Sequence, residues 1–576
     1  MLLLLLAAFG LRAWITATTL LDRGDCGSCL AAASVQHDLG LLALFVALTV
    51  AWLLLPRTLA WLAAALQGLL LLAIVADLVT LSNFSLRLSL RDVLKFGAEL
   101  QAVFGYTFAR LFSAEGLLAL LALLALLGFW LGWLRHLWRG RPAGARALAV
   151  VTVLAGVVYL LPGRAYHPLP WTYRNLLEVN WPSGVDRSYS AAYREQLEQL
   201  PEPTPSCHAG QATGRDLIVV LIESWSMYHG AELGVMDGTP GIDGLRARGT
   251  SWERFFSNGF TTDHGLIALL GGATPLPSVN RYRSLDAFAG FHDLPDSLPR
   301  RLAEDGYQSL FFTSGDLGFL GKGAWLQAIG FDHVEGHEQA YYEGMQRFAF
   351  GAVHDGQLYD RVLDWLGREH VMGQPYVAVV ETVTTHPPFT HPETGEQDEE
   401  GAFRFADREL LRFAQELEAR GFFDNGLLVV TSDQRALAAM RAEEWARYGN
   451  AAPALLPMLV LGPGFGDGAR ISVPGQMRDF PYSVDALLTD RACALPGSGL
   501  LFGAAPRPPG CILRPQGNQR DIVDAWCGEA HVRIELDGDE TQFLDPPPPG
   551  AAGLLEQVNR QRIRQGELDA DLSAIL

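Results

Sequence analysis

Positive charge is scarce in this chain, which has 44 Lys and Arg residues against 63 Asp and Glu, a net charge of −19. Nucleic-acid-binding proteins carry an excess of basic residues, so this balance argues against nucleic acid as a partner. Cysteine is also scarce, with six residues. Cys26 and Cys29 have the spacing of a metal or redox motif, but a lone CxxC in a short loop is better interpreted as a local structural disulfide.

The other four cysteines follow the apolar N-terminal region. Cys511 and Cys527 are close enough in sequence to pair, which would leave Cys207 with Cys493. We expect all six cysteines outside the cytoplasm, and an even number there is typical of disulfides in an oxidising compartment.

Apolar residues are concentrated in the first 163 positions, where we expect five membrane spans at residues 1–21, 39–55, 59–81, 116–134 and 147–161. A membrane helix needs about 20 apolar residues, so the second and fifth spans are short. The first span lacks the basic n-region of a signal peptide and is interrupted by Arg12, which favours a retained helix. Cleavage there would leave four spans and the same final topology.

The basic residues of the short loops predict the orientation of these spans. The loop at 135–146 contains four arginines and no acid: Arg135, Arg139, Arg141 and Arg146. Because cytoplasmic loops are rich in Lys and Arg, this loop should be cytoplasmic, and everything after residue 161 should lie outside. Residues 82–115 are predicted external although they carry Arg87 and Lys95, and we expect an amphipathic helix on the membrane surface there.

Residues 164–214 are polar and contain prolines, so we expect a juxtamembrane stalk and linker with one helical run near 189–199. Three apolar runs then end in polar side chains: DLIVVLIESWS reaches Glu223, PYVAVVETVTTHPPF passes Glu381 to His386, and GLLVVTSDQRA reaches Asp433. Such runs, separated by helical patterns, predict buried parallel strands of an α/β sheet. Ligand sites in such sheets lie beyond the carboxyl ends of the strands.

A further candidate is Thr262, in the stretch FTTDHGLIALLGG. The apolar residues 265–270 predict a short helix closing on Gly271 and Gly272, and Thr262 and Asp263 are placed where N-cap residues belong. A hydroxyl at a helix N-terminus meets unpaired N–H groups, which favour an alkoxide or a phosphate ester. The simpler alternative is an ordinary capping threonine.

These residue types suit metal-assisted group transfer. Glu223 and Asp433 supply hard anionic oxygens for a divalent cation, and Thr262 can add its hydroxyl oxygen. Coordination lowers the pKa of a hydroxyl and makes it a nucleophile toward phosphorus. His386 can hold the phosphate or protonate a leaving alkoxide. For Glu381 a structural role is favoured over a catalytic one.

With these motifs in order, the chain resembles the lipoteichoic acid synthase group of the alkaline phosphatase and sulfatase superfamily, which are membrane-anchored phosphoglycerol transferases. The resemblance implies an N-terminal five-helix transmembrane region (1–163), a stalk (164–214) and a sulfatase-like α/β domain with a mostly parallel central sheet (215–510). It assigns no role to residues 511–576. It also implies that Glu223 binds metal and that TDHGL makes Thr262, rather than Thr261, the nucleophile. FFTSGDLGFLGKG places a basic phosphate-binding residue at Lys322, and TTHPPF places the substrate-binding histidine at His386.

One position departs from the family pattern. Where the family has Asp-His, this chain has Asp433-Gln434, and an amide oxygen is a weaker metal ligand than imidazole. An all-oxygen site favours Mn²⁺, Mg²⁺ or Ca²⁺ over Zn²⁺. We expect Mn²⁺, with Mg²⁺ as the alternative, and His264 is a candidate to compensate. The C/S-x-P-x-R signature of sulfatases is absent around Thr262, which argues against sulfate hydrolysis through formylglycine.

The expected protein is therefore a multi-pass enzyme of the bacterial inner membrane with its catalytic domain on the periplasmic or extracellular side. It would transfer phosphoglycerol from a lipid such as phosphatidylglycerol to a glycan or polymer hydroxyl through phospho-Thr262. Phosphoethanolamine transfer is the alternative within the same class. From another class, Gln434 leaves open a catalytically weakened membrane protein that binds phospholipid or glycan.

Overall fold

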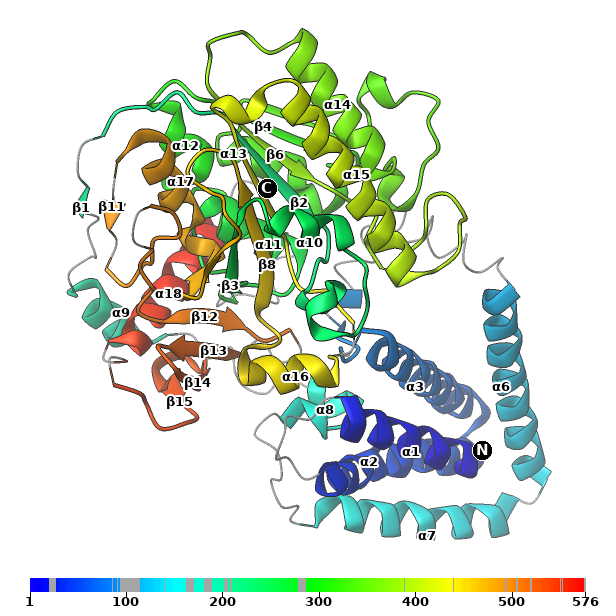
Figure 1. The fold of residues 1–576 in the computed structure, drawn as a ribbon. Coiled ribbons are helices and arrows are strands. Elements are labelled where there is room, and N and C mark those ends of the chain that lie inside the picture. Colours follow the sequence, from blue (N-terminus) through cyan, green and yellow to red (C-terminus); the bar gives the residue numbers. More distant parts are fainter. Residues whose placement is uncertain are drawn as a thin grey trace. The chain divides into compact units, whose positions relative to one another are not determined.

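The computed structural model describes most of the chain and divides it into two compact units (Figure 1). The N-terminal unit comprises Met1–Ser183 and Ala438–Gly449, and the C-terminal unit comprises Gly184–Leu437 and Asn450–Leu576. The described residues are 1–573 without 20–26, 85, 91, 94–113, 140, 162–169, 181–188, 201–205, 208–209, 278–285, 388, 439, 492, 495, 504–505, 518–520, 550 and 552.

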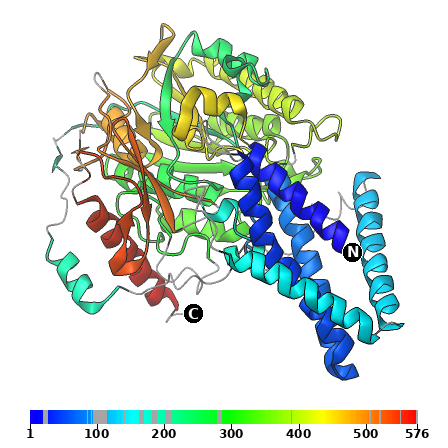
Figure 2. The same cartoon turned by 90° about the horizontal axis from the view of Figure 1, so that it is seen from below.

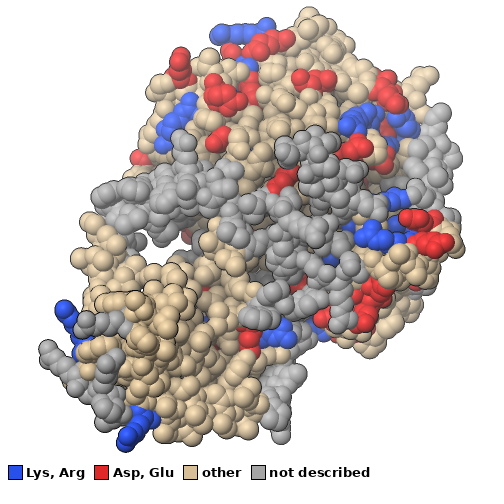
Figure 3. All heavy atoms as spheres, turned by 180° about the vertical axis from the view of Figure 1, so that it is seen from behind, with Lys and Arg blue, Asp and Glu red and all other residues tan. Residues whose placement is uncertain are grey.

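Five apolar helices form most of the N-terminal unit: α1 (Leu2–Thr19), α2 (Gly27–Leu54), α3 (Arg57–Phe84), α6 (Ala114–Arg139) and α7 (Arg141–Leu160). They correspond to the five expected spans, but among the described residues only α2, α3 and α6 are both long and apolar enough to cross a membrane. The apolar parts of α1 and α7 are shorter. The helices expose many large apolar side chains, among them Leu3, Trp61, Leu69, Leu118 and Val153. The result is the broad uncharged surface at the lower left of Figure 3.

Two features of this unit differ from expectation. Helix α2 begins at Gly27, well before the apolar run expected from residue 39, so it is longer than the expected span and carries Asp38 within it. Most of the predicted amphipathic helix at 82–115 lies outside the described residues. Within the described part, Arg87 is buried in an ion pair with Asp77 instead of lying on the membrane surface. A buried guanidinium needs such a partner because its desolvation is costly.

A nine-stranded sheet forms the centre of the C-terminal unit, with strand order β10-β3-β8-β7-β2-β6-β4-β5 and β9 paired with β3. The strands are β2 (Leu217–Ile222), β3 (Thr250–Phe256), β4 (Gln308–Thr313), β5 (His333–Glu335), β6 (Tyr376–Glu381), β7 (Leu427–Ser432), β8 (Leu455–Leu461), β9 (Ala469–Ile471) and β10 (Gly475–Gln476). Strand β8 runs antiparallel to both of its neighbours, and the other pairings are parallel. The expected mostly parallel α/β sheet is confirmed.

Helices cover both faces of this sheet because its central strands are apolar on both sides. Alternate residues of β2 enter two separate cores: Leu217, Val219 and Leu221 face one, and Ile218, Val220 and Ile222 the other. The first core is closed by α11 (Thr262–Gly271), α12 (Leu298–Ala303), α13 (Lys322–Ala328) and α17 (Phe480–Thr489). The second is closed by α10 (Pro240–Arg246), α14 (Asp355–Arg368) and α15 (Glu399–Ala419).

The C-terminal extension forms a small antiparallel sheet and a helix of its own (Figure 1, Figure 2). The elements are β12 (Ile512–Pro515), β13 (Ile522–Cys527), β14 (Ala530–Glu535), β15 (Gln542–Phe543) and α18 (Leu554–Ser573). The predicted Cys511–Cys527 disulfide is confirmed. Cys29 and Cys493 are also disulfide-bonded, and β1 (Ser206–Cys207) pairs with β11 (Cys493–Ala494) so that Cys207 lies opposite Cys493.

The helical run expected in the stalk is α9 (Ala191–Glu198), which is capped by the Ser190 side chain. It does not stand free. The Tyr189 hydroxyl donates to Asn559 of α18 at 2.6 Å, so this part of the stalk packs against the C-terminal extension.

Candidate functional site

Three neighbouring strands, β7, β2 and β6, end side by side and bring their terminal acids together. Glu223 follows β2, Asp433 follows β7, and Glu381 is the last residue of β6. Because β2 pairs in parallel with both other strands, these residues share one edge of the sheet. The sheet thus joins positions that are up to about 210 residues apart in the sequence.

Thr262 lies at the N-terminal end of α11 and is half-buried. The N-cap is Thr261 rather than Thr262, which is the first helical residue, so the capping prediction was wrong by one position. The predicted helix end is confirmed, since Gly272 caps α11 in the left-handed conformation. The Thr262 hydroxyl lies 3.5 Å from Glu223 Oε2. The site therefore has a hydroxyl at a helix N-terminus beside a carboxylate.

Gly265 allows α11 to approach the end of β7. A Cβ atom at Gly265 would lie 1.9 Å from the Asp433 carbonyl oxygen, far inside van der Waals contact. Only glycine permits this separation. The glycine of the TDHG motif therefore sets the distance between Thr262 and Asp433.

Glu223 and Asp433 form a pair of buried carboxylates. Ser224 connects them: its hydroxyl donates to Glu223 Oε1 at 2.7 Å, and its backbone N–H donates to Asp433 Oδ1 at 3.0 Å. Ser224 adopts a φ of 60°, unusual for a residue with a side chain. Burial raises the pKa of both carboxyl groups. The charge of Glu381 raises the pKa of Glu223 further, and that of Glu223 raises the pKa of Asp433 further. Two adjacent buried carboxylates call for a cation.

Gln434 completes the oxygen-rich face of this pair. Its Nε2 lies 3.4 Å from Glu223 Oε1. Its Oε1 is buried without a hydrogen-bond partner, as is Oδ2 of Asp433. Two carboxylates with hydroxyl and amide oxygens are a donor set that fits a hard divalent cation. Across the described residues, no three His, Cys, Asp or Glu side chains are grouped as metal ligands. The ring of His264 packs edge-on against Phe260, with centroids 4.9 Å apart.

Lys322 is one of only two lysines in the chain, and it is positioned by the third strand end. It is the first residue of α13, and its Nζ forms a salt bridge of 2.5 Å with Glu381 Oε2. The other carboxylate oxygen of Glu381 is buried without a partner. This contact agrees with the structural role favoured for Glu381. It also holds the ammonium near the strand ends, within electrostatic range of His386.

His386 follows β6 in the loop TTHPPF. Its Nδ1 lies 2.6 Å from the Pro387 carbonyl oxygen, and its ring contacts Phe350 edge-on at 4.8 Å. Since a carbonyl only accepts, Nδ1 carries the proton, and a neutral ring then has an unprotonated Nε2. Burial lowers the pKa of His386, while the charge of Asp433 opposes that shift. The ring is therefore suited to accept a proton at neutral pH.

Arg514 is a residue near the site that sequence reasoning missed. This buried guanidinium comes from β12 of the C-terminal extension and donates from Nε to the Gly259 carbonyl oxygen at 3.1 Å. Burial lowers the pKa of Arg514 to about 10, with an opposing effect from Asp524 and a further lowering from Arg435, the residue after Gln434. No sequence pattern connects β12 with the loop before Thr262, so only the tertiary structure reveals this contact.

Comparison with known proteins supports the family resemblance. The model of the Sulfatase family matches residues 215–464. Phosphoglycerol transferase I of Xanthomonas axonopodis pv. citri (strain 306) is 25% identical over 188 residues, which cover 30% of this chain and 26% of that protein. Phosphoglycerol transferase I of Citrobacter koseri is 23% identical over 340 residues, 51% of this chain and 42% of that protein. The matches thus span less than half the length of these relatives.

Two solved structures also align with this chain at low sequence identity. An alkaline phosphatase superfamily protein from Vibrio parahaemolyticus aligns with a TM-score of 0.48 and 18% identity over 66% of this chain and 94% of that one. The lipoteichoic acid synthase LtaP from Listeria monocytogenes aligns with a TM-score of 0.46 and 17% identity, over 66% of this chain and 98% of LtaP. The match to the Sulfatase family model at residues 215–464 lies within the predicted catalytic domain.

Proposed function

We propose that this chain, whose residues 215–464 match the Sulfatase family model, is a membrane-bound transferase that moves phosphoglycerol from a phospholipid to a hydroxyl of a glycan or polymer. The observation that carries the proposal is the half-buried Thr262 hydroxyl at the start of α11, 3.5 Å from Glu223. The apolar helices of the N-terminal unit would hold the enzyme in the membrane that contains its donor. The curated phosphoglycerol transferases to which the chain is similar support this substrate class.

The first step forms a covalent intermediate. The Thr262 oxygen attacks the phosphorus of phosphatidylglycerol and loses its proton to solvent, and the bond from phosphorus to the diacylglycerol oxygen breaks. Diacylglycerol leaves after its oxygen takes a proton from solvent water. A divalent cation bound by Glu223, Asp433, Gln434 and Thr262 would lower the pKa of the Thr262 hydroxyl. The N–H groups at the start of α11 and the Lys322 ammonium stabilise the negative phosphoryl oxygens.

The second step transfers the group. The oxygen of an acceptor hydroxyl attacks the phosphorus, the bond to Thr262 breaks, the Thr262 oxygen regains a proton from solvent, and phosphoglycerol remains on the acceptor. The unprotonated Nε2 of His386 suits removal of the acceptor's proton. The sequence had also suggested that His386 protonates a leaving alkoxide, but its neutral state favours the base role.

Mass spectrometry of Thr262 after incubation with phosphatidylglycerol tests this proposal, because the mass of the adduct identifies the transferred group. Thr262→Ala should abolish both adduct and transfer, whereas the neighbouring cap variant Thr261→Ala should retain measurable activity. Loss of a covalent nucleophile commonly costs several powers of ten in rate. Full activity in Thr262→Ala would exclude this nucleophile.

Other results would favour the alternatives. A phosphoethanolamine adduct from phosphatidylethanolamine would replace the phosphoglycerol assignment. No adduct and no turnover with any phospholipid would favour a lipid-binding protein weakened at Gln434.

A further inference from the structure

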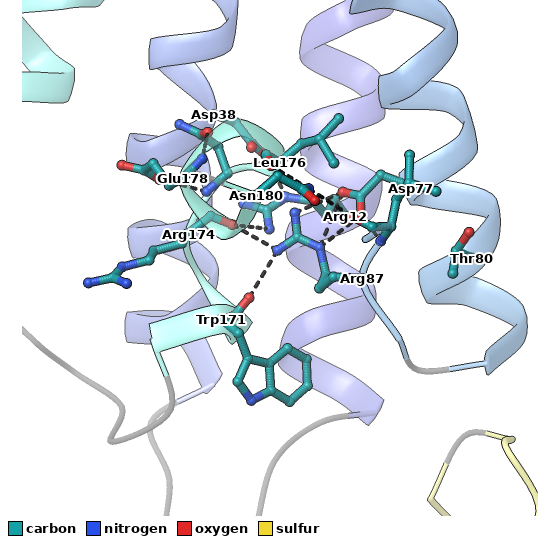
Figure 4. Close-up of polar contacts among 12 residues, drawn as sticks. Arg12, Asp38, Asp77, Thr80, Arg87, Trp171, Arg174, Leu176, Glu178 and Asn180 are labelled. Atoms are coloured by element: carbon teal, nitrogen blue, oxygen red, sulfur yellow. Dashed lines mark hydrogen bonds and ion pairs between the residues drawn. The ribbon is translucent and has the colours of Figure 1, made fainter. Parts of the chain in front are cut away.

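The N-terminal unit contains two buried ion pairs among its apolar helices (Figure 4). Arg12 of α1 donates from Nε to Asp38 of α2 at 2.7 Å. Arg87 donates from Nη2 to Asp77 of α3 at 2.8 Å. All four residues are at most 5% exposed. Ionised side chains within a membrane region are costly, so their presence suggests a specific use.

Their use is to hold one short segment of chain, residues 170–180, which we name the strap. It consists of the 3₁₀ helix η1 (Pro170–Thr172) and α8 (Leu176–Asn180). Arg12 donates to the backbone oxygens of Tyr173 and Arg174 at 3.1 and 3.2 Å. Arg87 donates to those of Trp171 and Arg174 at 2.9 and 2.8 Å. Two buried guanidinium groups therefore fix the same carbonyl group, that of Arg174.

Glu178 fixes the other end of the strap. Its carboxylate accepts from the Tyr159 hydroxyl at 2.9 Å and from the Asn175 N–H at 2.7 Å, and it lies 2.8 Å from His37 Nδ1. These contacts lower the pKa of Glu178 despite its burial. The Glu178 carboxylate is thus charged and already satisfied by groups of the protein.

A cavity of about 450 Å³ lies beside the strap, a size within the range of small-molecule sites. It is lined by Gly40, Leu41, Tyr159, Arg174, Asn175, Leu177 and Glu178. At Gly40, α2 packs closely against Tyr159 of α7, since a Cβ atom at Gly40 would lie 3.0 Å from the Tyr159 ring. The walls combine the side chains of Leu41, Tyr159 and Leu177 with those of Arg174, Asn175 and Glu178.

The Arg174 side chain is exposed and differs from the other arginines of this cluster. Its carbonyl oxygen is fixed twice, yet within the described residues its guanidinium has no hydrogen-bond or ion-pair partner. Figure 4 shows it extending away from the buried pairs. The fixed backbone keeps Arg174 beside the cavity, and its guanidinium is therefore available to an anion that enters there.

The depth of the cavity suggests which anion binds. Tyr159 is next to the end of α7 at Leu160, and on α2 the polar residues Gln36, His37 and Asp38 directly precede Leu39. The cavity contains Gly40 and Tyr159, so it lies at the end of α7 and beside a polar stretch of α2. Phospholipid head groups occupy that depth, and tyrosine is enriched there.

We propose that this cavity binds the head group of a phospholipid, with the phosphate on Arg174 and the start of an acyl chain against Leu41 and Leu177. Because the Glu178 carboxylate is occupied by His37 and Tyr159, the cavity offers no free carboxylate to an ammonium group. It therefore selects an anionic glycerol head group over ethanolamine. The identification of this lipid as the donor rests on the proposed function. The binding of the lipid in this cavity does not depend on that function.

The test measures lipid binding by the full-length Thr262→Ala protein, so that turnover cannot deplete the ligand. The protein is reconstituted in phosphatidylcholine nanodiscs containing phosphatidylglycerol, phosphatidylethanolamine or diacylglycerol, and the retained lipid is identified by native mass spectrometry. Arg174→Met keeps the carbonyl that Arg12 and Arg87 bind. Arg146→Met is the matched control, because Arg146 is exposed on α7 and does not line the cavity.

We expect phosphatidylglycerol to be retained in preference to the other two lipids. Arg174→Met should weaken its retention roughly tenfold, as for a lost charge-assisted contact, and Arg146→Met should have no effect. Equal retention by the two variants, or equal retention of phosphatidylethanolamine and phosphatidylglycerol, would overturn the proposal. Arg174-dependent retention without any adduct on Thr262 in the native protein would confirm the lipid site and refute the transferase.

Discussion

Gly265→Ala should disrupt the candidate active site without changing any polar group. The new Cβ would lie 1.9 Å from the carbonyl oxygen of Asp433 and 2.8 Å from its carbonyl carbon. Ordinary van der Waals contacts of a Cβ atom begin at 3.4 Å. Helix α11 or the end of β7 must therefore move by about 1.5 Å. Inserting a methyl group into a packed region costs about 1–3 kcal/mol, against which the better helix propensity of alanine returns about 1 kcal/mol.

The effect on activity should exceed the effect on stability. A misplacement of about 1 Å can reduce a rate about 100-fold, and the movement here separates Thr262 from Asp433. Thermal unfolding gives the loss of stability, and the rate of adduct formation on Thr262 gives the loss of activity. Gly244→Ala is the matched control, since Gly244 is also in a helix, α10, and a Cβ there meets nothing within 4 Å. Native stability and native adduct formation in Gly265→Ala would refute the reasoning.

Three further predictions concern other contacts. Lys322→Met should destabilise the fold by about 3 kcal/mol or more because it leaves the Glu381 charge buried and unpaired; adding Glu381→Leu should restore stability but not transfer. Arg514→Met should slow transfer about tenfold by releasing Gly259, whereas Arg533→Met in the same small sheet should not. Burial raises the pKa of Asp407 to about 6, so the folded protein favours the protonated carboxyl group. The resulting contribution of Asp407 to the free energy of unfolding is full below about pH 4 and is lost as the pH rises through 6. Asp407→Asn should remove that slope, up to about 3 kcal/mol, from unfolding free energies measured between pH 4 and 7.

Each of these predictions has an outcome that contradicts it. Transfer restored together with stability in the Lys322 and Glu381 double variant would show that the lysine acts only in folding. Equal effects of the two arginine variants would assign Arg514 a general structural role. Parallel pH profiles of the native protein and Asp407→Asn would mean that Asp407 titrates near its ordinary pKa.

Local sequence patterns predicted much of the framework, because they depend on neighbouring residues. Apolar runs such as residues 217–222 are strands with both faces buried. Apolar residues 265–270 followed by two glycines form a helix that ends at Gly272. The rule that ligands bind at the carboxyl ends of parallel strands then grouped Glu223, His386 and Asp433 before their neighbours in the sheet were known.

The contacts between distant segments were decided only by the tertiary structure. Strand order places β2 between β6 and β7, and no periodicity within a strand specifies its neighbours. The contact of Arg514 with Gly259 joins residues 255 positions apart, and that of Arg12 with the strap joins residues more than 160 apart. Sequence alone shows that Arg12 interrupts an apolar segment. Its partner Asp38 and the fixed carbonyl of Arg174 follow from packing, because a buried charge is stable only where the fold brings an opposite charge and acceptors to it.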